Sequence, residues 1–371
     1  MNILGISCFY HDSAAALICD GQIIAAASEE RFNRKKNSPD LPIQAINFCL
    51  QQANLTAFDI DYLGFYEKPF LKFSRVILSH LKSFPFSSRN FLSTLPYWLE
   101  DRLIMPLIFN RELGYAGETL FIKHHLAHAA SAFLVSPFEE AVILTADAVG
   151  EWATTACGAG RGNAIKIVRE LHFPDSLGLL YTAVTTYLGF EAHEGEGKVM
   201  GLAGYGKPVY LNAFRRMVKL HADASFSLDE GYFGFNRGSR MYSQRFIKLF
   251  GPERKKDAKI QERHCDIAAS LQRFTEEVLV GIARVLFQEF KIDRLCLAGG
   301  MFLNCVANAK ILQDTPFKEV FIQPAAGDSG GALGVAAYIN HCLLGKSRES
   351  IMQQAYLGPE FPKEFLRRIL T

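Results

Sequence analysis

The chain has 371 residues, of which 49% are hydrophobic and 21% are charged, so its composition is that of a globular protein and excludes a disordered one. This length exceeds one ordinary hydrophobic core and predicts two or three structural units. The formal net charge of +2 gives no electrostatic case for nucleic acid or for a membrane surface as a partner.

Neither an export signal nor a membrane anchor is expected. The apolar N-terminal run is interrupted by His11 and Asp12 and has no basic segment before it, so it predicts a core strand. No stretch approaches ~18 uninterrupted apolar residues. The eight cysteines are scattered without a CxxC pair, which is typical of reduced, buried thiols. These features predict a cytoplasmic protein.

The first predicted unit along the chain has three strands. Two apolar runs within residues 3–19 indicate neighbouring strands, and the Asp20-Gly21 hairpin turn indicates that a third strand returns beside the second. A helix is expected at 41–50, with Pro42 in its first turn.

Two segments resist a periodic interpretation. Residues 65–112 are rich in Phe, Leu and basic residues, and we interpret them as a helical insertion. Residues 222–260 are polar and rich in Gly, Tyr and Phe. Their run Arg254-Lys255-Lys256 is typical of a solvated face.

The order of the first unit recurs from Ala141. An apolar run ends at Asp147, a second strand is expected at 152–157, a turn at 160–163 leads to a third strand, and a helix is expected at 177–188. The shared order, with an acidic residue in each strand-to-strand loop, predicts an internal duplication, with the strands of 3–27 and 141–171 at the centres of separate sheets.

Alternating helix and strand follow. Apolar residues at helical spacing between 267 and 286 predict a long amphipathic helix. Buried strands are expected at 295–298 and 319–323, and each runs into a glycine-rich turn. Such alternation predicts an α/β protein with sheets covered by helices, in which ligands lie beyond the strand ends.

The sharpest local signal is HHLAHAA at residues 124–130. Its small residues favour a helix, on which His124 and His128 share one face at the spacing that lets two imidazoles hold one metal ion. His125 and His128 are also a permitted pair. Taken alone, the run is explained equally well by hydrogen-bonded core histidines.

Two acidic residues favour the interpretation of this run as part of a metal site. Asp147 ends a buried strand, and Asp328 lies in a glycine-rich strand-to-helix turn. An unpaired buried carboxylate is costly, so each needs a partner. Two His and two Asp side chains form a mixed N/O set suited to iron, manganese or zinc. The alternative for each Asp is a turn or helix-cap role.

Glycine-rich turns and basic residues are candidates for binding phosphate. Backbone N–H groups in such turns can approach a phosphate, although packing of a helix on a sheet is the usual reason for Gly-Gly. Lys198 follows an acid-glycine run that is otherwise a charged loop. The nucleotide-binding candidates are Lys198, Gly299, Gly300, Asn304, Gly327, Ser329 and Gly330.

A further candidate lies between the first two predicted strands. His11 stands beside Asp12 and is able to act as a general base or to orient a substrate, although a simple turn is the alternative. The basic run ending at Lys36 is a candidate for holding an anion.

Taken in order, the motifs resemble the carbamoyltransferase family, enzymes that carbamoylate nodulation factors and antibiotics. The matching blocks are HDSAAAL, SEERFNRKK, HHLAHAASAF, LTADAVGE, EGKVMGLAGYGKP, AGGMFLNCVAN and IQPAAGDSGGALGVA. The family core is similar to the duplicated, two-lobed actin/Hsp70/sugar-kinase (RNase H-like) fold, which closes over ATP.

The resemblance implies site residues. A divalent metal, with iron as first choice and manganese or zinc as alternatives, would be held by His124, His128, Asp147 and Asp328. This set favours His124 over His125. His11 matches a loop histidine that assists transfer, and Lys36 matches a basic residue near the phosphates.

The resemblance also implies a reaction and a domain plan. Carbamoyl phosphate and ATP would form carbamoyl-adenylate, from which the carbamoyl group passes to a hydroxyl of a small-molecule acceptor. We expect a first lobe at 1–140 with its insertion at about 65–112, a second lobe at 141–345, and at 346–371 the truncated start of a YrdC-like C-terminal domain. Another polypeptide that supplies this domain would then be a partner.

Two further functions remain open. A sugar-kinase-like phosphotransferase has the same fold, but such enzymes hold Mg²⁺ through carboxylates and phosphates rather than through an HxxxH helix. The other alternative is a non-catalytic nucleotide-binding remnant, or a subunit that needs a separate C-terminal domain. A zinc peptidase is disfavoured because HEXXH is absent.

Overall fold

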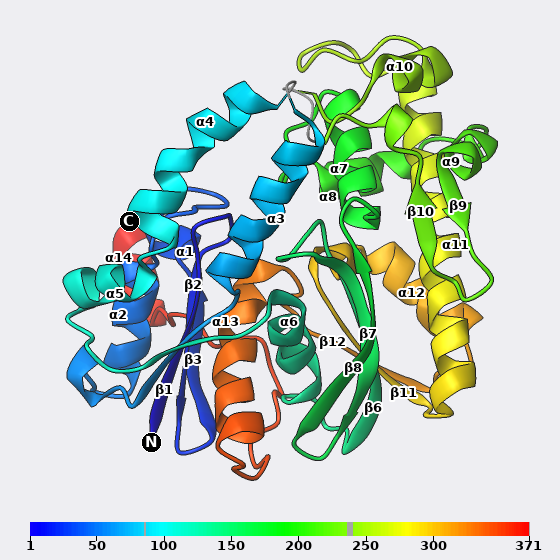
Figure 1. Cartoon of the computed structure of the whole chain (residues 1–371). Helices are drawn as coiled ribbons and strands as arrows, with labels where there is room; N and C mark the ends of the chain where they lie inside the picture. Colours follow the sequence, from blue (N-terminus) through cyan, green and yellow to red (C-terminus); the bar gives the residue numbers. More distant parts are fainter. Residues whose placement is uncertain (85–86, 236–239, 371) are drawn as a thin grey trace.

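The computed structural model describes residues 1–84, 87–235 and 240–370, which form two five-stranded sheets with helices (Figure 1). The first sheet has the order β3-β2-β1-β4-β5. Its strands are β1 (Asn2–Ser7), β2 (Ala14–Cys19), β3 (Gln22–Ser28), β4 (Tyr62–Phe65) and β5 (Thr119–Phe121). Strands β1 to β3 are antiparallel neighbours, and β4 and β5 run parallel to β1.

The second sheet repeats this plan, with the order β8-β7-β6-β11-β12. Its strands are β6 (Glu140–Ala146), β7 (Ala153–Arg161), β8 (Ala164–His172), β11 (Arg294–Ala298) and β12 (Glu319–Ile322). The pairing directions match those of the first sheet strand by strand. The predicted duplication and the actin/Hsp70/sugar-kinase-like α/β fold are therefore confirmed.

The two duplicated hairpins lie in separate sheets, as predicted, but only their first strands are central. β3 and β8 form edges, so each hairpin extends from an edge to the middle of its sheet. The physical reason is that the later parallel strands, β4 and β11, add on the free side of β1 and β6.

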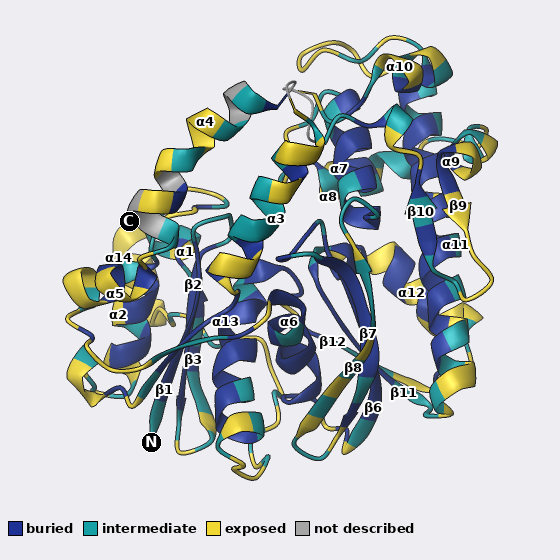
Figure 2. Cartoon of the chain, in the orientation of Figure 1, coloured by how far each residue is buried: buried dark blue, intermediate teal, exposed yellow. Residues whose placement is uncertain are grey.

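Two buried helices lie between the sheets, α6 (His124–Phe133) and α13 (Asp328–Ala337) (Figures 1 and 2). They pack so closely that a Cβ atom on Gly334 would stand 1.9 Å from the carbonyl oxygen of Ala127. α6 packs on β6 and β11, whereas α13 packs on β1 and β2. These two helices connect the sheets.

Other helices flank the sheets near their predicted positions. The helix expected at 41–50 is α2 (Ile43–Gln52), with Pro42 as its N-cap, and the helix expected at 177–188 is α7 (Leu177–Tyr187). The long amphipathic helix is α11 (Glu262–Phe290). The remaining elements are α1 (Glu30–Asn33), η1 (Ala57–Asp59), α8 (Glu196–Ala203), α9 (Leu211–Met217), β9 (Val218–Leu220), β10 (Phe226–Leu228), η3 (Glu230–Tyr232), α10 (Gln244–Phe250), η4 (Gly300–Leu303), α12 (Cys305–Asp314), η5 (Tyr338–Leu343) and α14 (Lys363–Leu370).

The segment 65–112 is largely helical, as interpreted, with α3 (Pro69–Lys82), α4 (Ser88–Tyr97), η2 (Trp98–Arg102) and α5 (Met105–Leu113). Strand β4 ends at Phe65, the first residue of this segment. In segment 222–260 the basic run is only partly a solvated face. Arg254 donates hydrogen bonds to the carbonyl oxygens of Leu188 and Ala258, whereas Lys255 and Lys256 are exposed.

The end of the chain packs on the core as far as Leu357, whose carbonyl oxygen accepts a 3.0 Å hydrogen bond from Ala26 N–H on β3. α14 has no buried residue. The predicted domain limits, including a new domain from 346, stay predictions. Within the described part of the chain, every helix falls short of the length and apolarity needed to cross a membrane.

Candidate metal centre and adjoining pocket

Helix α6 places two histidines on one buried face. The small residues of its sequence allow it to pack between the sheets, and His124 and His128 point the same way because they are one turn apart. Their Nε2 atoms lie 3.1 Å apart and their rings are perpendicular. Both side chains are almost completely buried.

Two carboxylates converge on these imidazoles, one from the end of a strand and one from the start of a helix. Asp147 follows β6, and its Oδ2 lies 3.0 Å from His124 Nε2 and 3.2 Å from His128 Nε2. Asp328 begins α13, and its Oδ1 lies 3.6 Å and 3.5 Å from the same two atoms. The four groups offer ligand atoms that all lie within 4.8 Å of one another.

The chemistry of this cluster fits a bound cation. Oδ1 of Asp328, which lies against both Nε2 atoms, is buried without a hydrogen-bond partner among the described residues. Burial opposes charge on His128, but the hydrogen bond to Asp147 and the negative charges of Asp147 and Asp328 outweigh it and raise the pKa of His128 to about 9. Without a metal, the two carboxylates therefore favour the protonated form of His128. A bound divalent ion would replace that proton.

His125 faces away from this cluster. Its Nδ1 lies 2.8 Å from Thr145 Oγ1 and its Nε2 lies 3.0 Å from the carbonyl oxygen of Ala153. Burial, followed by the charges of the neighbouring histidines, lowers the pKa of His125 to about 3, so the ring is neutral. The structure thus groups His124, and not His125, with His128. Metal binding by this group stays a prediction.

Tyr66 is a buried neighbour of the cluster that the sequence analysis did not select. Its hydroxyl donates a 3.3 Å hydrogen bond to Asp328 Oδ2, and its ring centroid lies 5.3 Å from that of His124. Burial raises the pKa of Tyr66 well above its usual value, so the phenol keeps its proton. The only signal in the sequence is its position directly after β4, a strand too short to be recognised by periodicity.

A pocket of about 220 Å³ adjoins the two carboxylates. Three predicted nucleotide-binding residues line it, namely Gly300, Asn304 and Gly327. Gly299 supports its wall, since its φ of 106° and a Cβ position 2.2 Å from Ala146 O exclude other residues. The Asn304 side chain is already engaged, because it caps α12 and bonds to Gln272.

His11 closes the first-lobe side of this pocket. Its Nε2 lies 3.8 Å from Asp328 Oδ2, and its Nδ1 lies 2.9 Å from Asp12 Oδ2. Burial opposes its protonation, but Asp328 and Asp12 raise the pKa of His11 to about 9. The ring of His193, which also lines the pocket, lies 4.5 Å from that of His11, and Asn37 Nδ2 donates a 3.3 Å hydrogen bond to His193 O.

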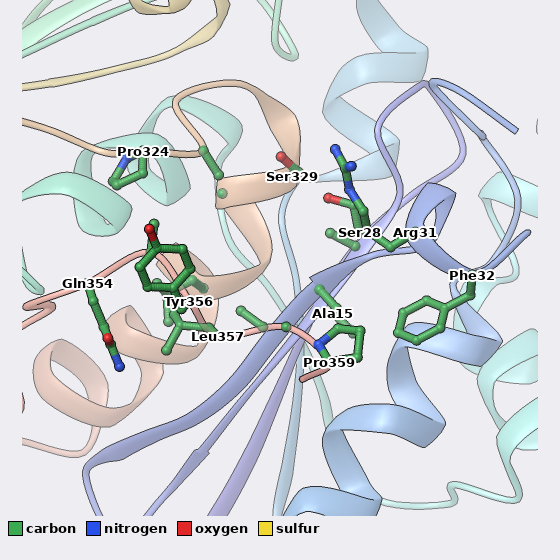
Figure 3. Close-up of a pocket in the computed structure, with 18 of the residues that line it drawn as sticks. Ala15, Ser28, Arg31, Phe32, Pro324, Ser329, Gln354, Tyr356, Leu357 and Pro359 are labelled. Atoms are coloured by element: carbon green, nitrogen blue, oxygen red, sulfur yellow. The ribbon is translucent and has the colours of Figure 1, made fainter. Parts of the chain in front are cut away.

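The structure does not bring the other predicted residues to this pocket. Lys36 and Lys198 are exposed and do not line it. Ser329 and Gly330 line a separate hollow of about 940 Å³, where Ser329 and Arg31 point into the same space (Figure 3). Packing explains Gly330, because a Cβ there would stand 2.1 Å from Ala325 O.

The fold and the site together define a class, a two-lobed α/β protein of the actin/Hsp70/sugar-kinase type with a His/Asp cluster beside its pocket. The family described as "Carbamoyltransferase N-terminus" matches residues 2–337. The chain belongs to this family.

Three of its curated relatives are longer than this chain. An uncharacterized protein of Synechocystis sp. is 44% identical over 383 residues, which cover 100% of this chain and 62% of that protein. Nodulation protein NolNO of Sinorhizobium fredii is 36% identical, with coverage of 95% and 49%. Nodulation protein NolO of Bradyrhizobium diazoefficiens is 33% identical, with coverage of 66% and 42%. The chain therefore spans less than two thirds of each of these proteins.

Solved structures resemble the chain only distantly. Component A of the Acidaminococcus fermentans (R)-2-hydroxyglutaryl-CoA dehydratase has 14% identity and a TM-score of 0.49, with coverage of 91% of this chain and 97% of that chain. HypF of T. kodakarensis has 12% identity and a TM-score of 0.46, with coverage of 95% and 49%. These similarities carry no functional argument.

Proposed function

We propose that the chain takes part in ATP- and metal-dependent carbamoyl transfer from carbamoyl phosphate, through carbamoyl-adenylate, to a hydroxyl of a small-molecule acceptor. The observation that carries this proposal is the convergence of two imidazoles and two carboxylates beside a pocket that His11 also lines. Membership of the carbamoyltransferase family supports the proposal that the transferred group is a carbamoyl group. The C-terminal domain expected to form the adenylate would come from the longer protein or from a partner.

Four side chains would hold the metal, His124, His128, Asp147 and Asp328. Their nitrogen and oxygen donors, without a thiolate, suit a first-row divalent ion, with iron as first choice and manganese or zinc as alternatives. When bound, such an ion supplies positive charge that offsets the negative charge of phosphate oxygens. The pocket beside it is the site that we assign to ATP and to the carbamoyl intermediate.

His11 is the residue that we assign to proton transfer. Its Nε2 faces Asp328, and its ring borders the pocket, so an acceptor hydroxyl in the pocket would lie within its reach. A base must be neutral, whereas negative charge on Asp328 and Asp12 raises the pKa of His11 to about 9. A cation bound to Asp328 would offset part of that charge. Lys36 and Lys198 stay predictions as phosphate contacts.

The reaction is tested by mass spectrometry of candidate hydroxylated acceptors incubated with the protein, ATP and carbamoyl phosphate. Each mixture is run with and without a supplied YrdC-like domain. We expect a carbamoyl-sized mass increase that needs both ATP and carbamoyl phosphate. A phosphate-sized increase would identify a kinase instead, and nucleotide binding with no product under any condition would favour a non-catalytic subunit.

The ligand set is tested by replacing one histidine at a time. We expect His128→Ala to lose most of its metal by elemental analysis and to bind ATP more weakly. His125→Ala, measured for metal per folded protein, is the matched control because its ring faces Thr145. Full metal occupancy in His128→Ala, or loss of metal in His125→Ala alone, would show that the ligands are wrongly assigned.

A further inference from the structure

The first turn of α6 is held by one buried carboxylate from another part of the chain. Glu151, which is 5% exposed, lies in the loop after β6. Its Oε1 accepts hydrogen bonds from His124 N–H at 3.0 Å and from Lys68 N–H at 2.8 Å, and its Oε2 lies 3.3 Å from His124 N. Lys68 is the N-cap of α3, so one negative charge serves the first turns of two helices.

The other end of α6 is held by a cation. The guanidinium of Arg348 donates hydrogen bonds to the carbonyl oxygens of Phe133 at 2.9 Å, Leu134 at 3.2 Å and Ser136 at 2.8 Å. It also lies over the Phe133 ring, 4.6 Å from the centroid. Phe133 is the last residue of α6 and Leu134 is its C-cap, and Ser136 lies just beyond. Phe133 O also accepts from Ser136 N–H and Oγ, so Arg348 adds donors and positive charge at the negative end of the helix dipole.

These contacts fix where α6 lies along its own axis. Asp147 and Glu151 belong to one short loop, and they contact the same residue, His124, through its ring and through its backbone. Gly150, between them, leaves room for the imidazole, since a Cβ there would stand 2.9 Å from His124 Cβ. A small slide of α6 would therefore separate the histidines from Asp147.

We propose that Glu151 and Arg348 are positioning residues that set the axial position of α6 and thereby hold His124 and His128 at coordinating distance from Asp147. Neither residue is proposed as a metal ligand. Glu151 and Arg348 act on the cluster through the backbone of α6. The consequence for metal affinity rests on the proposed function, whereas the hold on α6 does not.

The experiment uses the full chain and compares Glu151→Ala and Arg348→Ala with the wild type. Co²⁺ is the probe, and its affinity and visible absorption spectrum are measured by titration. We expect affinity to fall by about tenfold or more in each variant, with an altered spectrum, as for other residues that orient metal ligands. Glu151→Gln keeps one oxygen acceptor and Arg348→Lys keeps the charge, so both should recover part of the affinity.

Arg215→Ala and Glu277→Ala are the matched controls, because these two residues form an ion pair on the second lobe away from α6. Hydrogen exchange of α6 is measured in the same proteins without metal. We expect faster exchange of the His124 amide in Glu151→Ala and unchanged exchange in the controls. Should an alanine variant not fold, its conservative partner is measured, and an affinity and exchange equal to the wild type would count against the proposal.

The two readouts separate the possible failures. If wild-type protein takes up no Co²⁺, the proposed metal function falls, and exchange alone decides the hold on α6. If Co²⁺ affinity and spectrum are unchanged in folded Glu151→Ala and Arg348→Ala, the positioning role is overturned. If α6 exchange is unchanged in both variants, the proposed hold on the helix is overturned as well.

Discussion

Short side chains at the ends of strands set the geometry of the cluster. Asp147 leaves β6 directly, so its carboxylate is placed by the sheet, and Oδ2 meets both imidazoles without a flexible stem. Gly300 borders the same carboxylate, because a Cβ there would stand 2.9 Å from Asp147 Oδ1. The absence of a side chain at 300 is thus a direct requirement of the cluster.

Gly300→Ala should therefore weaken metal binding. The added methyl group pushes Asp147 away from the histidines, and we expect a loss of about tenfold in Co²⁺ affinity with a smaller change in thermal stability. Gly281→Ala in α11 is the control, since its Cβ would meet nothing within 4 Å. Equal affinities in the two variants, measured by titration, would contradict this account.

His125 gives a pH dependence that can be isolated. Burial lowers the pKa of His125 to about 3 from 6.5, so folding disfavours its protonated form. The stability that its neutral ring contributes is fully present above pH 6.5 and is lost as the pH falls from 6.5 towards 3. In metal-free protein we expect His125→Asn to be less stable at neutral pH and to lose less stability on acidification. If the unfolding free energies of the two proteins change in parallel across this pH range, the pH dependence does not come from His125.

At the scale of elements, the duplicated units were the most predictable part of the structure. The hairpins at 3–27 and 141–171 carry apolar runs and turn residues, and long helices such as α11 carry a clear period. β4 and β5 were not predicted because they have only four and three residues and, unlike the equally short β12, run into no glycine-rich turn. Strands of this length hold no period, and they form because β1 and its helices offer a surface to pair with.

The candidate site was also only partly predictable from the sequence. His124 and His128 were predictable as a pair because the spacing of a helix is fixed. The choice between His124 and His125 was not predictable from spacing alone, since it depends on Thr145 and on the loop after β6. Lys36 and Lys198 were selected for charge, and a charge on the surface does not determine which cavity it serves.

The segment after η5 divides into a packed part and an exposed part. Arg348 donates to carbonyls of α6 and Leu357 bonds to β3, whereas every residue of α14 lies outside the core. Removal of residues 363–371 should leave the melting temperature unchanged. Removal from 346 onward should destabilise the protein by about 1–3 kcal/mol or more, because buried carbonyls lose their donor. Calorimetry of the two truncations tests this difference, and equal melting temperatures would contradict it.

At the scale of the whole molecule, the two sheets share α6 and α13, and the proposed ligands come from both sides of that junction. Asp147 follows a strand of the second sheet, His124 and His128 lie on α6, and Asp328 begins α13. The junction is tightly packed, with Gly334 against Ala127. The proposed metal centre therefore lies at the packed junction between the two sheets.

The contact between the His11 and His193 rings leads to a kinetic prediction. The pocket that both side chains line, about 220 Å³, is smaller than the ~300–1,000 Å³ typical of small-molecule sites. If ATP binds there as proposed, we expect it to enter only after the ring contact and the Asn37 hydrogen bond have opened, so that opening limits the association rate and the same contacts slow escape. Asn37→Ala should raise the association and dissociation rates of ATP together and leave the equilibrium affinity nearly constant. Stopped-flow measurements would show this as faster exchange at equal occupancy, whereas a change in dissociation alone would mean that Asn37 contacts the nucleotide directly.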